Sequence, residues 1–204
     1  MILRDLLERS DYQCTQGDVN VEISTLVYDS RKIEEGSVFV CISGAAFDGH
    51  QFAAQAAEKG AAAIVIEKDV QVPETLTVIR VENTRLALAE MSAAYFGYPA
   101  EELTTIGITG TKGKTTITYM IRQVLEHAGQ KTGLIGTIET IIGDERIPSV
   151  NTTPESYVVQ ESFRKMADAG CKNVVMEVSS QGLMLHRVGG FTFDYGMFTN
   201  LAED

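Results

Sequence analysis

Apolar and polar residues are arranged along the first hundred residues in a way that predicts a compact α/β unit. Short apolar runs of strand length lie between stretches with helical spacing. The helix predicted at 51–59 ends at Gly60, since glycine easily adopts the left-handed conformation that terminates helices. Pro99 cannot continue the helix predicted before it. The predicted order is helix 2–9, strands 24–28 and 37–41, helix 51–59, strands 62–66 and 76–81, and helix 84–96.

Strands and helices alternate again after residue 98, which predicts a doubly wound, mainly parallel α/β domain. Its run at 173–178 is almost wholly apolar, as expected of a parallel strand covered on both faces. Gly143 and Asp144 predict a hairpin turn, and Thr153 is expected to be the N-cap of the next helix. The predicted order is strand 103–109, helix 114–128, strand 132–136, hairpin strands 137–142 and 145–150, helix 154–169, and strands 173–178 and 194–199.

These patterns predict two domains, residues 1–98 and residues 99–204. The last predicted strand is followed only by the loop 200–204. A doubly wound sheet needs a covering helix after such a strand. The second domain is therefore expected to be truncated at its C-terminal end.

The composition is that of an ordinary globular protein, with 44% hydrophobic and 22% charged residues among 204. A net charge of −11 argues against a nucleic-acid or acidic-membrane partner, because such partners need a basic surface. No apolar run approaches the roughly 20 residues that cross a bilayer. Three widely spaced cysteines suggest neither a disulfide framework nor a zinc site, so a reducing cytoplasm is expected. Any phosphate site has to be built locally.

A glycine-rich turn between the predicted strand 103–109 and helix 114–128 carries the strongest chemical signal. It reads Gly107-Ile108-Thr109-Gly110-Thr111-Lys112-Gly113-Lys114-Thr115-Thr116. In such a loop the backbone N–H groups and the helix N-terminus attract phosphate, Lys114 reaches the β- and γ-phosphates, and the Thr115 hydroxyl binds Mg²⁺. The spacing departs from the standard P-loop, because five residues separate Gly107 from the Gly113-Lys114 pair. A glycine-rich turn without a ligand is the alternative.

Glu177 ends an otherwise apolar strand. Ligands bind at the carboxyl ends of strands in such sheets, and a carboxylate buried there needs a cation or hydrogen-bond donors. A metal-bound nucleotide would supply the cation. A carboxylate that caps a neighbouring helix is the alternative.

Several motifs together resemble the Mur ligase family. Thr109-Gly110-Thr111-Lys112-Gly113-Lys114-Thr115-Thr116 looks like the TGTxGKTT loop of these ligases and of their relative folylpolyglutamate synthetase. Met176-Glu177-Val178-Ser179-Ser180 resembles the EVSS motif, whose glutamate holds Mg²⁺. The resemblance implies that Lys114 and Glu177 are catalytic and that Thr115 and Glu177 are metal ligands. It implies an ATP-binding set of Gly110, Thr111, Lys112, Gly113, Lys114, Thr115 and Thr116.

Two further segments resemble substrate-binding motifs of the family. Asn151-Thr152-Thr153-Pro154 matches NTTP, which implies contacts with the sugar and peptide of a UDP-linked substrate, although a simple helix cap is the bland reading. Ser179 and Arg187 match substrate-contacting positions further on. Leu185 stands where a contacting glutamine is common, so it is not expected to bind. Gln181 replaces a common histidine, and its role and that of His186 stay open; His186 is equally an ordinary surface histidine.

The first domain resembles the family's UDP-binding domain. Asp29-Ser30-Arg31 followed by Gly36-Ser37-Val38-Phe39-Val40 is similar to its DSR…GxxFV pattern, which implies uridine contacts by Tyr28 and Ser30. The loop Gly44-Ala45-Ala46-Phe47-Asp48-Gly49-His50 matches GxxxDGH and is implied to approach the uracil and diphosphate. Without the family, Asp29-Ser30-Arg31 reads as a turn with a solvated salt bridge.

The resemblance implies ATP-dependent amide formation. The terminal carboxylate of the substrate attacks the γ-phosphate, and the incoming amine displaces the resulting acyl phosphate. The DSR-type first domain with NTTP and EVSS points to the member that adds the third residue, meso-diaminopimelate or L-lysine, to UDP-N-acetylmuramoyl-L-alanyl-D-glutamate in peptidoglycan synthesis. The expected partners are ATP with Mg²⁺, this UDP-linked dipeptide and an amino acid, without nucleic acid or membrane insertion, for a monomer in the bacterial cytoplasm.

Two other functions stay open. Another Mur ligase or a folylpolyglutamate synthetase-like enzyme would share the phosphate loop. A non-catalytic nucleotide-binding module would be complete within these residues and would show no exposed apolar face. The family continues with a further catalytic segment and an amino-acid-selecting domain, so the chain is expected to be inactive alone.

Overall fold

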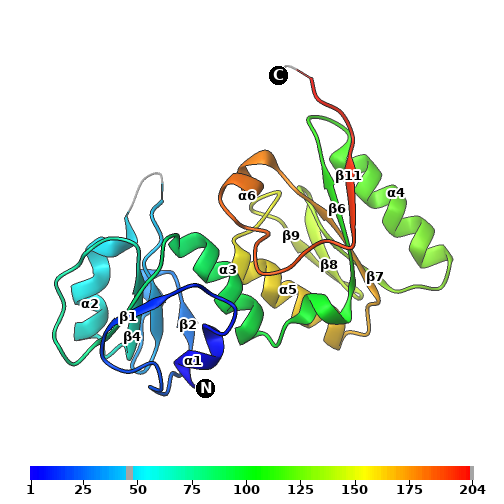
Figure 1. Cartoon of the computed structure of the whole chain (residues 1–204). Coiled ribbons are helices and arrows are strands. Elements are labelled where there is room, and N and C mark those ends of the chain that lie inside the picture. The colour runs from blue at the N-terminus through cyan, green and yellow to red at the C-terminus, as the bar shows by residue number, and fades with distance from the viewer. Residues whose placement is uncertain (45–47, 203–204) are drawn as a thin grey trace. The chain divides into compact units, whose positions relative to one another are not determined.

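The computed structural model describes residues 1–44 and 48–202 and divides the chain into two compact units, Met1–Tyr95 and Phe96–Asp204 (Figure 1). The sequence placed the division after residue 98, and the roles that it gave to the two parts remain predictions. No helix within the described residues is long and apolar enough to cross a bilayer.

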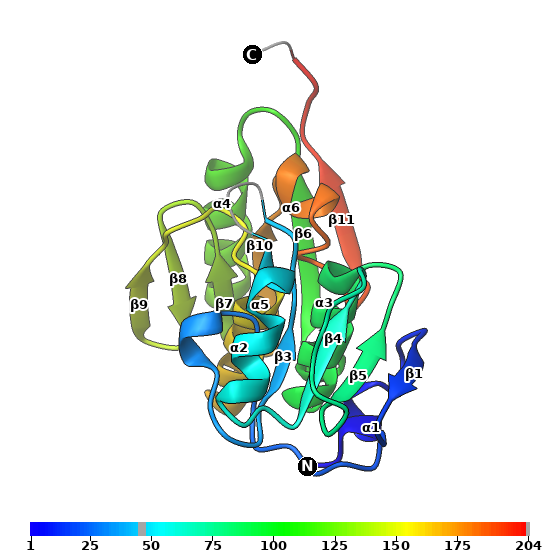
Figure 2. The ribbon, with the colours of Figure 1, turned by 90° about the vertical axis from the view of Figure 1, so that its left-hand side faces the viewer.

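The first unit is built on a five-stranded sheet in the order β1-β5-β4-β3-β2. Figure 2 labels the first four of these strands. The neighbours among β2 to β5 pair in parallel, and β1 is antiparallel to β5. Ala53 and Ala56 of α2 pack on the face that carries Phe39 and Ile64. The elements are α1 Leu3–Leu6, β1 Gln13–Gln16, β2 Leu26–Val27, β3 Val38–Val40, α2 Ala53–Glu58, β4 Ala63–Ile66, β5 Thr77–Arg80 and α3 Thr84–Tyr95.

The predicted helices and strands of this unit are all present, although two are shorter than predicted, and the structure adds one strand. The strand predicted at 24–28 is only Leu26–Val27. The strand β1 was not predicted, because three of its four residues are polar and the strand is largely exposed. Backbone pairing of β1 with β5 holds it at the sheet edge, so no apolar pattern marks it. The helix predicted at 2–9 is only Leu3–Leu6.

The second unit is built on a six-stranded sheet in the order β11-β6-β10-β7-β8-β9. The first four of these strands are parallel, and β8 and β9 form the predicted antiparallel hairpin. Right-handed crossovers through α4 and α5 run in opposite directions across the sheet and therefore place these helices on opposite faces. The elements are β6 Thr104–Thr109, α4 Lys114–His127, β7 Thr132–Ile135, β8 Glu139–Ile142, β9 Glu145–Pro148, α5 Ser156–Asp168, β10 Asn173–Glu177, α6 Ser180–Met184 and β11 Tyr195–Phe198. A doubly wound, mainly parallel domain is confirmed.

Two features of this unit differ from the sequence prediction or from a fully covered sheet. The helix α5 begins at Ser156 with Glu155 as its N-cap, so the prediction of Thr153 as the cap was wrong. The edge strand β11 leaves Tyr195 and Phe198 each 64% exposed. The second unit therefore has an apolar sheet edge in contact with solvent.

The core of the second unit depends on Phe163, which is completely buried in α5 and packs with Val174 and Met176 of β10. We predict that Phe163→Ala lowers the free energy of unfolding of this unit by about 3–5 kcal/mol, because it removes a large ring from a close-packed site. Urea denaturation, monitored through hydrogen exchange of the β10 amides, measures this loss. Val150→Ala, at a position that is 96% exposed, is the control and should stay within about 0.5 kcal/mol. Equal stability of the two variants would contradict the described core.

Candidate functional site

The glycine-rich loop joins β6 to α4, as the sequence predicts. Gly110 and Gly113 have φ values of 131° and 87°, in the region that favours glycine, and Gly113 directly precedes the helix. The Lys114 ammonium bends back over the loop and donates to the carbonyl oxygens of Gly110 at 2.6 Å and Thr111 at 3.1 Å. The Lys114 ammonium thus lies over the loop at the N-terminus of α4, and a helix N-terminus is where an anion is most stable.

Residues after β11 clamp this loop from the neighbouring strand. The Asn200 side chain accepts from the Lys112 N–H and donates to the Lys112 carbonyl, both at 3.0 Å. Thr199 donates to the same carbonyl at 2.8 Å, and the Thr111 N–H donates to the Asn200 carbonyl. No sequence motif marks Thr199 or Asn200. The sequence signal for them was their position at and directly after the end of a predicted strand. Parallel strands end at one edge of the sheet, so residues at that position can reach the glycine-rich loop that follows β6.

Glu177 lies at the end of β10 and is completely buried. Its Oε2 accepts from the hydroxyls of Thr115 at 2.9 Å and Thr137 at 3.0 Å. Its Oε1 accepts from the Thr137 backbone N–H at 2.9 Å. These donors offset the cost of burying a carboxylate. Two of them are hydroxyl groups and the third is the N–H of a turn residue, so the capping of a helix N-terminus does not account for Glu177.

The donor set of Thr115 and Glu177 fits a magnesium ion. Mg²⁺ prefers oxygen ligands at roughly 2.1 Å in octahedral geometry, so adjacent ligands are roughly 3.0 Å apart. The Thr115 and Glu177 oxygens already lie 2.9 Å apart. Among the described residues no group of three or more His, Cys, Asp or Glu side chains could hold a metal ion.

The segment 151–154 lies at the same end of the sheet. The buried Thr153 hydroxyl donates to the Glu177 carbonyl at 3.1 Å and accepts from the Ser179 N–H at 3.0 Å. These tertiary bonds explain why Thr153 does not cap α5. The Thr152 hydroxyl lies 3.0 Å from that of Thr137, whereas Asn151 is exposed.

Ser179 and Arg187 hold this segment in place. The Ser179 hydroxyl caps α6 by accepting from the Gly182 N–H at 3.0 Å. Arg187 donates to the Thr153 carbonyl at 3.0 Å and lies 3.7 Å from a Glu155 carboxylate oxygen. The structure therefore brings 151–154, Ser179 and Arg187 to the end of the strand that carries Glu177. Lys112 and Thr116, also predicted to bind ATP, are exposed on the loop and the first turn of α4.

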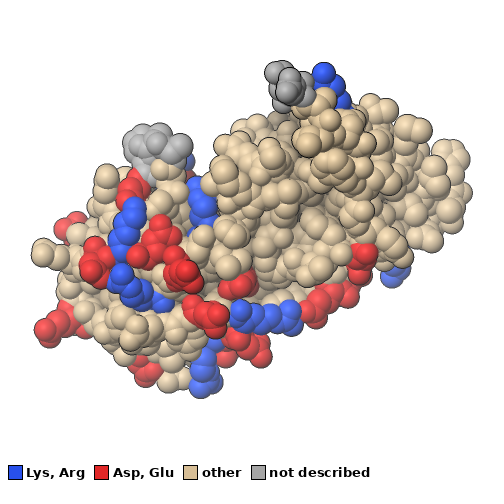
Figure 3. Space-filling view, turned by 45° about the horizontal axis from the view of Figure 1, so that its top comes forward, with Lys and Arg blue, Asp and Glu red and all other residues tan. Residues whose placement is uncertain are grey.

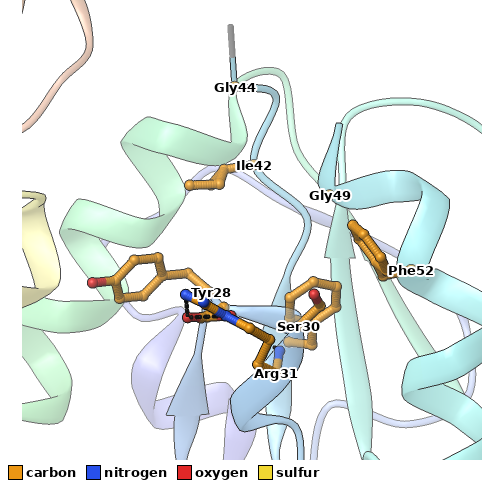
Figure 4. Close-up of a pocket in the computed structure, with 9 residues that line it drawn as sticks. Tyr28, Ser30, Arg31, Ile42, Gly44, Gly49 and Phe52 are labelled. Carbon is orange, nitrogen blue, oxygen red and sulfur yellow. Dashed lines mark hydrogen bonds and ion pairs between the residues drawn. The ribbon is translucent and has the colours of Figure 1, made fainter. Parts of the chain in front are cut away.

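A separate pocket of about 570 Å³ lies in the first unit and contains the other predicted contacts. Tyr28 and Phe52 lie on opposite sides of it, and Ser30 and Arg31 lie between them at one rim (Figure 4). Aromatic walls with a polar rim suit a planar base that carries polar groups. The pocket is lined by Tyr28, Asp29, Ser30, Arg31, Phe39, Ile42, Gly44, Gly49 and Phe52.

The rim is fixed by a turn in which Asp29 precedes a 3-10 helix over Ser30–Lys32. Arg31 donates to both carboxylate oxygens of Asp29, at 2.9 Å from Nε and 2.7 Å from Nη2. The hydrogen bond from Arg31 lowers the pKa of Asp29 to about 2. The turn with a salt bridge is therefore present, and the same turn lines the pocket.

A polar cluster supports the segment that borders this pocket. Nε2 of the buried His50 accepts from the Glu67 N–H at 3.1 Å, so Nδ1 carries the proton that is donated to Asp48 at 2.6 Å. Lys68 also donates to Asp48, and with His50 it keeps the pKa of that carboxyl well below its usual range. No sequence motif marks Glu67 or Lys68, so neither was predicted. Residues 45–47 of the predicted GxxxDGH loop lie outside the described residues.

The two units differ in the charged side chains that they present on the face drawn in Figure 3. Acidic and basic side chains interleave over the first unit, whereas the visible face of the second unit carries few acidic side chains (Figure 3). The net charge of −11 is therefore not concentrated on that face of the second unit.

Comparison with known proteins gives two family matches. Residues 108–204 match the Mur ligase middle domain, and residues 22–96 match the Mur ligase family catalytic domain. A relative from Clostridium perfringens (strain 13 / Type A) is 50% identical over 204 residues, which cover 100% of this chain and 42% of the relative. A relative from Bacillus licheniformis is 48% identical over 188 residues, covering 92% of this chain and 38% of the relative. Both are named UDP-N-acetylmuramoyl-L-alanyl-D-glutamate--2,6-diaminopimelate ligase.

Solved structures show the same fold. A structure of a UDP-N-acetylmuramoyl-L-alanyl-D-glutamate--2,6-diaminopimelate ligase superposes with a TM-score of 0.79 at 22% identity, covering 100% of this chain and 41% of that protein. A structure of MurF from Acinetobacter baumannii gives a TM-score of 0.55 at 22% identity, covering 88% of this chain and 36% of that protein. The chain thus spans about two-fifths of the length of the relatives that it matches.

Gly136 leaves the space that the Glu177 carboxylate occupies. A Cβ at this position would clash with Glu177 Oε1 and lie 3.3 Å from its Cδ. We predict that Gly136→Ala destabilises the second unit by about 1–3 kcal/mol, because both residues are buried and the carboxylate cannot move without losing its donors. Gly196→Ala in β11, where an added Cβ meets nothing within 4 Å, is the matched control in urea denaturation. Equal stability of the two variants would contradict the described packing of the Glu177 carboxylate against Gly136.

The Asp29 carboxyl, paired with Arg31, should titrate at unusually low pH. Because the folded-state pKa of Asp29 is lowered from 3.8 to about 2, the pair stabilises the fold above pH 4 and this stability is lost as pH falls through about 2. Arg31→Ala should return the pKa of Asp29 toward 3.8 and remove this pH dependence. NMR titration of the Asp29 carboxyl carbon measures it. Lys32→Ala, which removes a weaker influence on the same carboxyl, should shift the midpoint less. A midpoint near 3.8 in the unsubstituted chain would contradict the pairing.

Proposed function

Because the chain belongs to the Mur ligase family, we propose that it forms the UDP-substrate-binding and nucleotide-binding parts of an ATP-dependent ligase. This ligase adds the third residue to UDP-N-acetylmuramoyl-L-alanyl-D-glutamate in peptidoglycan synthesis. The names of the relatives favour 2,6-diaminopimelate over L-lysine as the added amino acid. We place this activity in the bacterial cytoplasm.

The observation that carries the proposal is one hydrogen-bonded chain of side chains at the end of the second sheet. It runs from Thr115, on the glycine-rich loop, to Glu177, and from there through Thr137 to Thr152. A phosphate loop and a segment matching a substrate-binding motif therefore share one buried carboxylate. An enzyme that must bring a substrate carboxylate against a nucleotide needs this proximity.

The site residues form two groups, one that would bind ATP and one that would bind the UDP-linked substrate. Lys114 and the loop N–H groups, from Gly110 to Thr116, would neutralise the ATP phosphates. Thr115 and Glu177 would hold Mg²⁺, which when bound spreads the negative charge of the phosphates. Asn151, Thr152, Thr153, Ser179 and Arg187 would contact the sugar and peptide of the substrate. The backbone and hydroxyl groups do much of this binding, which suits an acidic protein.

The pocket of the first unit would hold the uridine. Tyr28 and Ser30 are among its lining residues. The aromatic walls would stack on the base, and the polar rim would hydrogen-bond its edge or the ribose.

The alternatives are weaker on specific grounds. A folylpolyglutamate synthetase-like enzyme does not require the DSR-type first unit, whereas residues 22–96 match the Mur ligase family. A self-contained binding module was expected to show no exposed apolar face, yet Tyr195 and Phe198 are exposed on the edge strand β11.

We predict that the chain binds UDP-N-acetylmuramoyl-L-alanyl-D-glutamate in a calorimetric titration. Ser30→Ala and Thr152→Ala should each weaken binding by about 3- to 10-fold, the usual effect of one lost hydrogen bond. Thr75→Ala, an exposed threonine of the first unit, is the control and should change nothing. Binding of Mg-ATP with no binding of the UDP-linked peptide would remove the support for this ligase activity. Lys114→Ala tests the nucleotide site alone and should abolish ATP binding.

A further inference from the structure

The turn between β7 and β8 places one residue, Thr137, between the two halves of the proposed site. No motif in the sequence singles it out. Of the three hydrogen bonds that described residues donate to the Glu177 carboxylate, two come from Thr137. Its backbone N–H holds Oε1 and its hydroxyl holds Oε2, so both oxygens are fixed by one residue. The third bond comes from Thr115, on the phosphate-loop side.

The chemistry of the donors gives this arrangement a direction. A carboxylate only accepts, so the single hydroxyl proton of Thr137 is donated to Glu177. The Thr137 oxygen can then only accept in its 3.0 Å contact with the Thr152 hydroxyl, which must be the donor. Thr152 therefore donates to Thr137, and Thr137 donates to Glu177. A change at either end alters the hydrogen bond of the shared residue.

The backbone around Thr137 is shaped for this contact. The preceding Gly136 has no side chain where Oε1 lies, since a Cβ there would clash with it. The residue Thr137 is exposed, yet both of its donors are directed toward the buried carboxylate. An exposed turn residue that only hydrogen-bonded to water would not need this orientation.

We propose that Thr137 is a positioning residue that fixes Glu177 for the metal–nucleotide site and Thr152 for the substrate segment. This inference rests on the proposed function, because it assumes that Glu177 contributes to cation binding. Thr137 itself need not touch either ligand. Its hydroxyl sets the plane of the carboxylate and the rotamer of Thr152.

The test compares Thr137→Val, which keeps the shape and the backbone N–H but lacks the hydroxyl, with Thr137→Ser, which keeps the hydroxyl. ADP binding to the chain is titrated calorimetrically with and without Mg²⁺. Thr137→Val should reduce the gain in affinity that Mg²⁺ gives by about tenfold and leave metal-free binding unchanged, and Thr137→Ser should stay within about twofold of the unsubstituted chain. Thr152→Val, which removes only the donor to Thr137, should reduce the gain by about two- to threefold and serves if Thr137→Val does not fold.

Glu177→Gln separates failure of this inference from failure of the proposed function. If Mg²⁺ gives the unsubstituted chain no gain, or if Glu177→Gln keeps the gain, the metal assignment fails and this inference fails with it. If Glu177→Gln loses the gain but Thr137→Val keeps it, only the role of Thr137 is overturned. The role of Thr137 is also overturned if Thr137→Val weakens ADP binding equally with and without Mg²⁺, or if Thr137→Ser does not restore the gain in affinity from Mg²⁺. Either result indicates lost packing rather than a lost hydroxyl.

Discussion

The second unit is organised around the cost of burying one carboxylate. Glu177 is completely buried, and an unpaired charge there would destabilise the fold by several kcal/mol. The fold meets this cost with donors from two separate elements, the first turn of α4 and the turn after β7. Gly136 leaves room for the group, and Thr153 ties the strand end to the segment before α5. Several features of separate turns and loops are therefore consequences of one interaction.

Sheet topology explains why these distant residues meet. The strand β10 lies between β6 and β7 and is parallel to both, so the carboxyl ends of all three lie at one edge. The glycine-rich loop follows β6, Glu177 ends β10, and Thr137 follows β7. The strand β11 is parallel to β6 on its other side and brings Asn200 to the loop. A parallel sheet thus collects four loops at one edge without any contact being local in sequence.

The sequence predicts the parts of this structure whose signal is local. Apolar runs and glycine stops mark most strands and helices, and Gly143-Asp144 marks the hairpin. The glycine-rich loop and Glu177 stand out because their chemistry is unusual for a turn and for an apolar strand. Signals that arise only in three dimensions are missed. The polar strand β1 depends on pairing with β5, Thr153 is drawn from a helix cap by bonds to Glu177 and Ser179, and Thr137 and Asn200 acquire their contacts from strand order alone.

The same physical solution recurs in the first unit. There His50, held by the Glu67 N–H, fixes Asp48, and Lys68 also donates to that carboxylate. In both units a carboxylate is held by directed donors from neighbouring turns, and the segment next to it borders a candidate ligand site. An acidic protein cannot attract phosphates through net charge, so it must position a few donors accurately. Carboxylates fixed in this way set the geometry of the loops, while in the proposed function Lys114 and the backbone N–H groups would provide the attraction for phosphate.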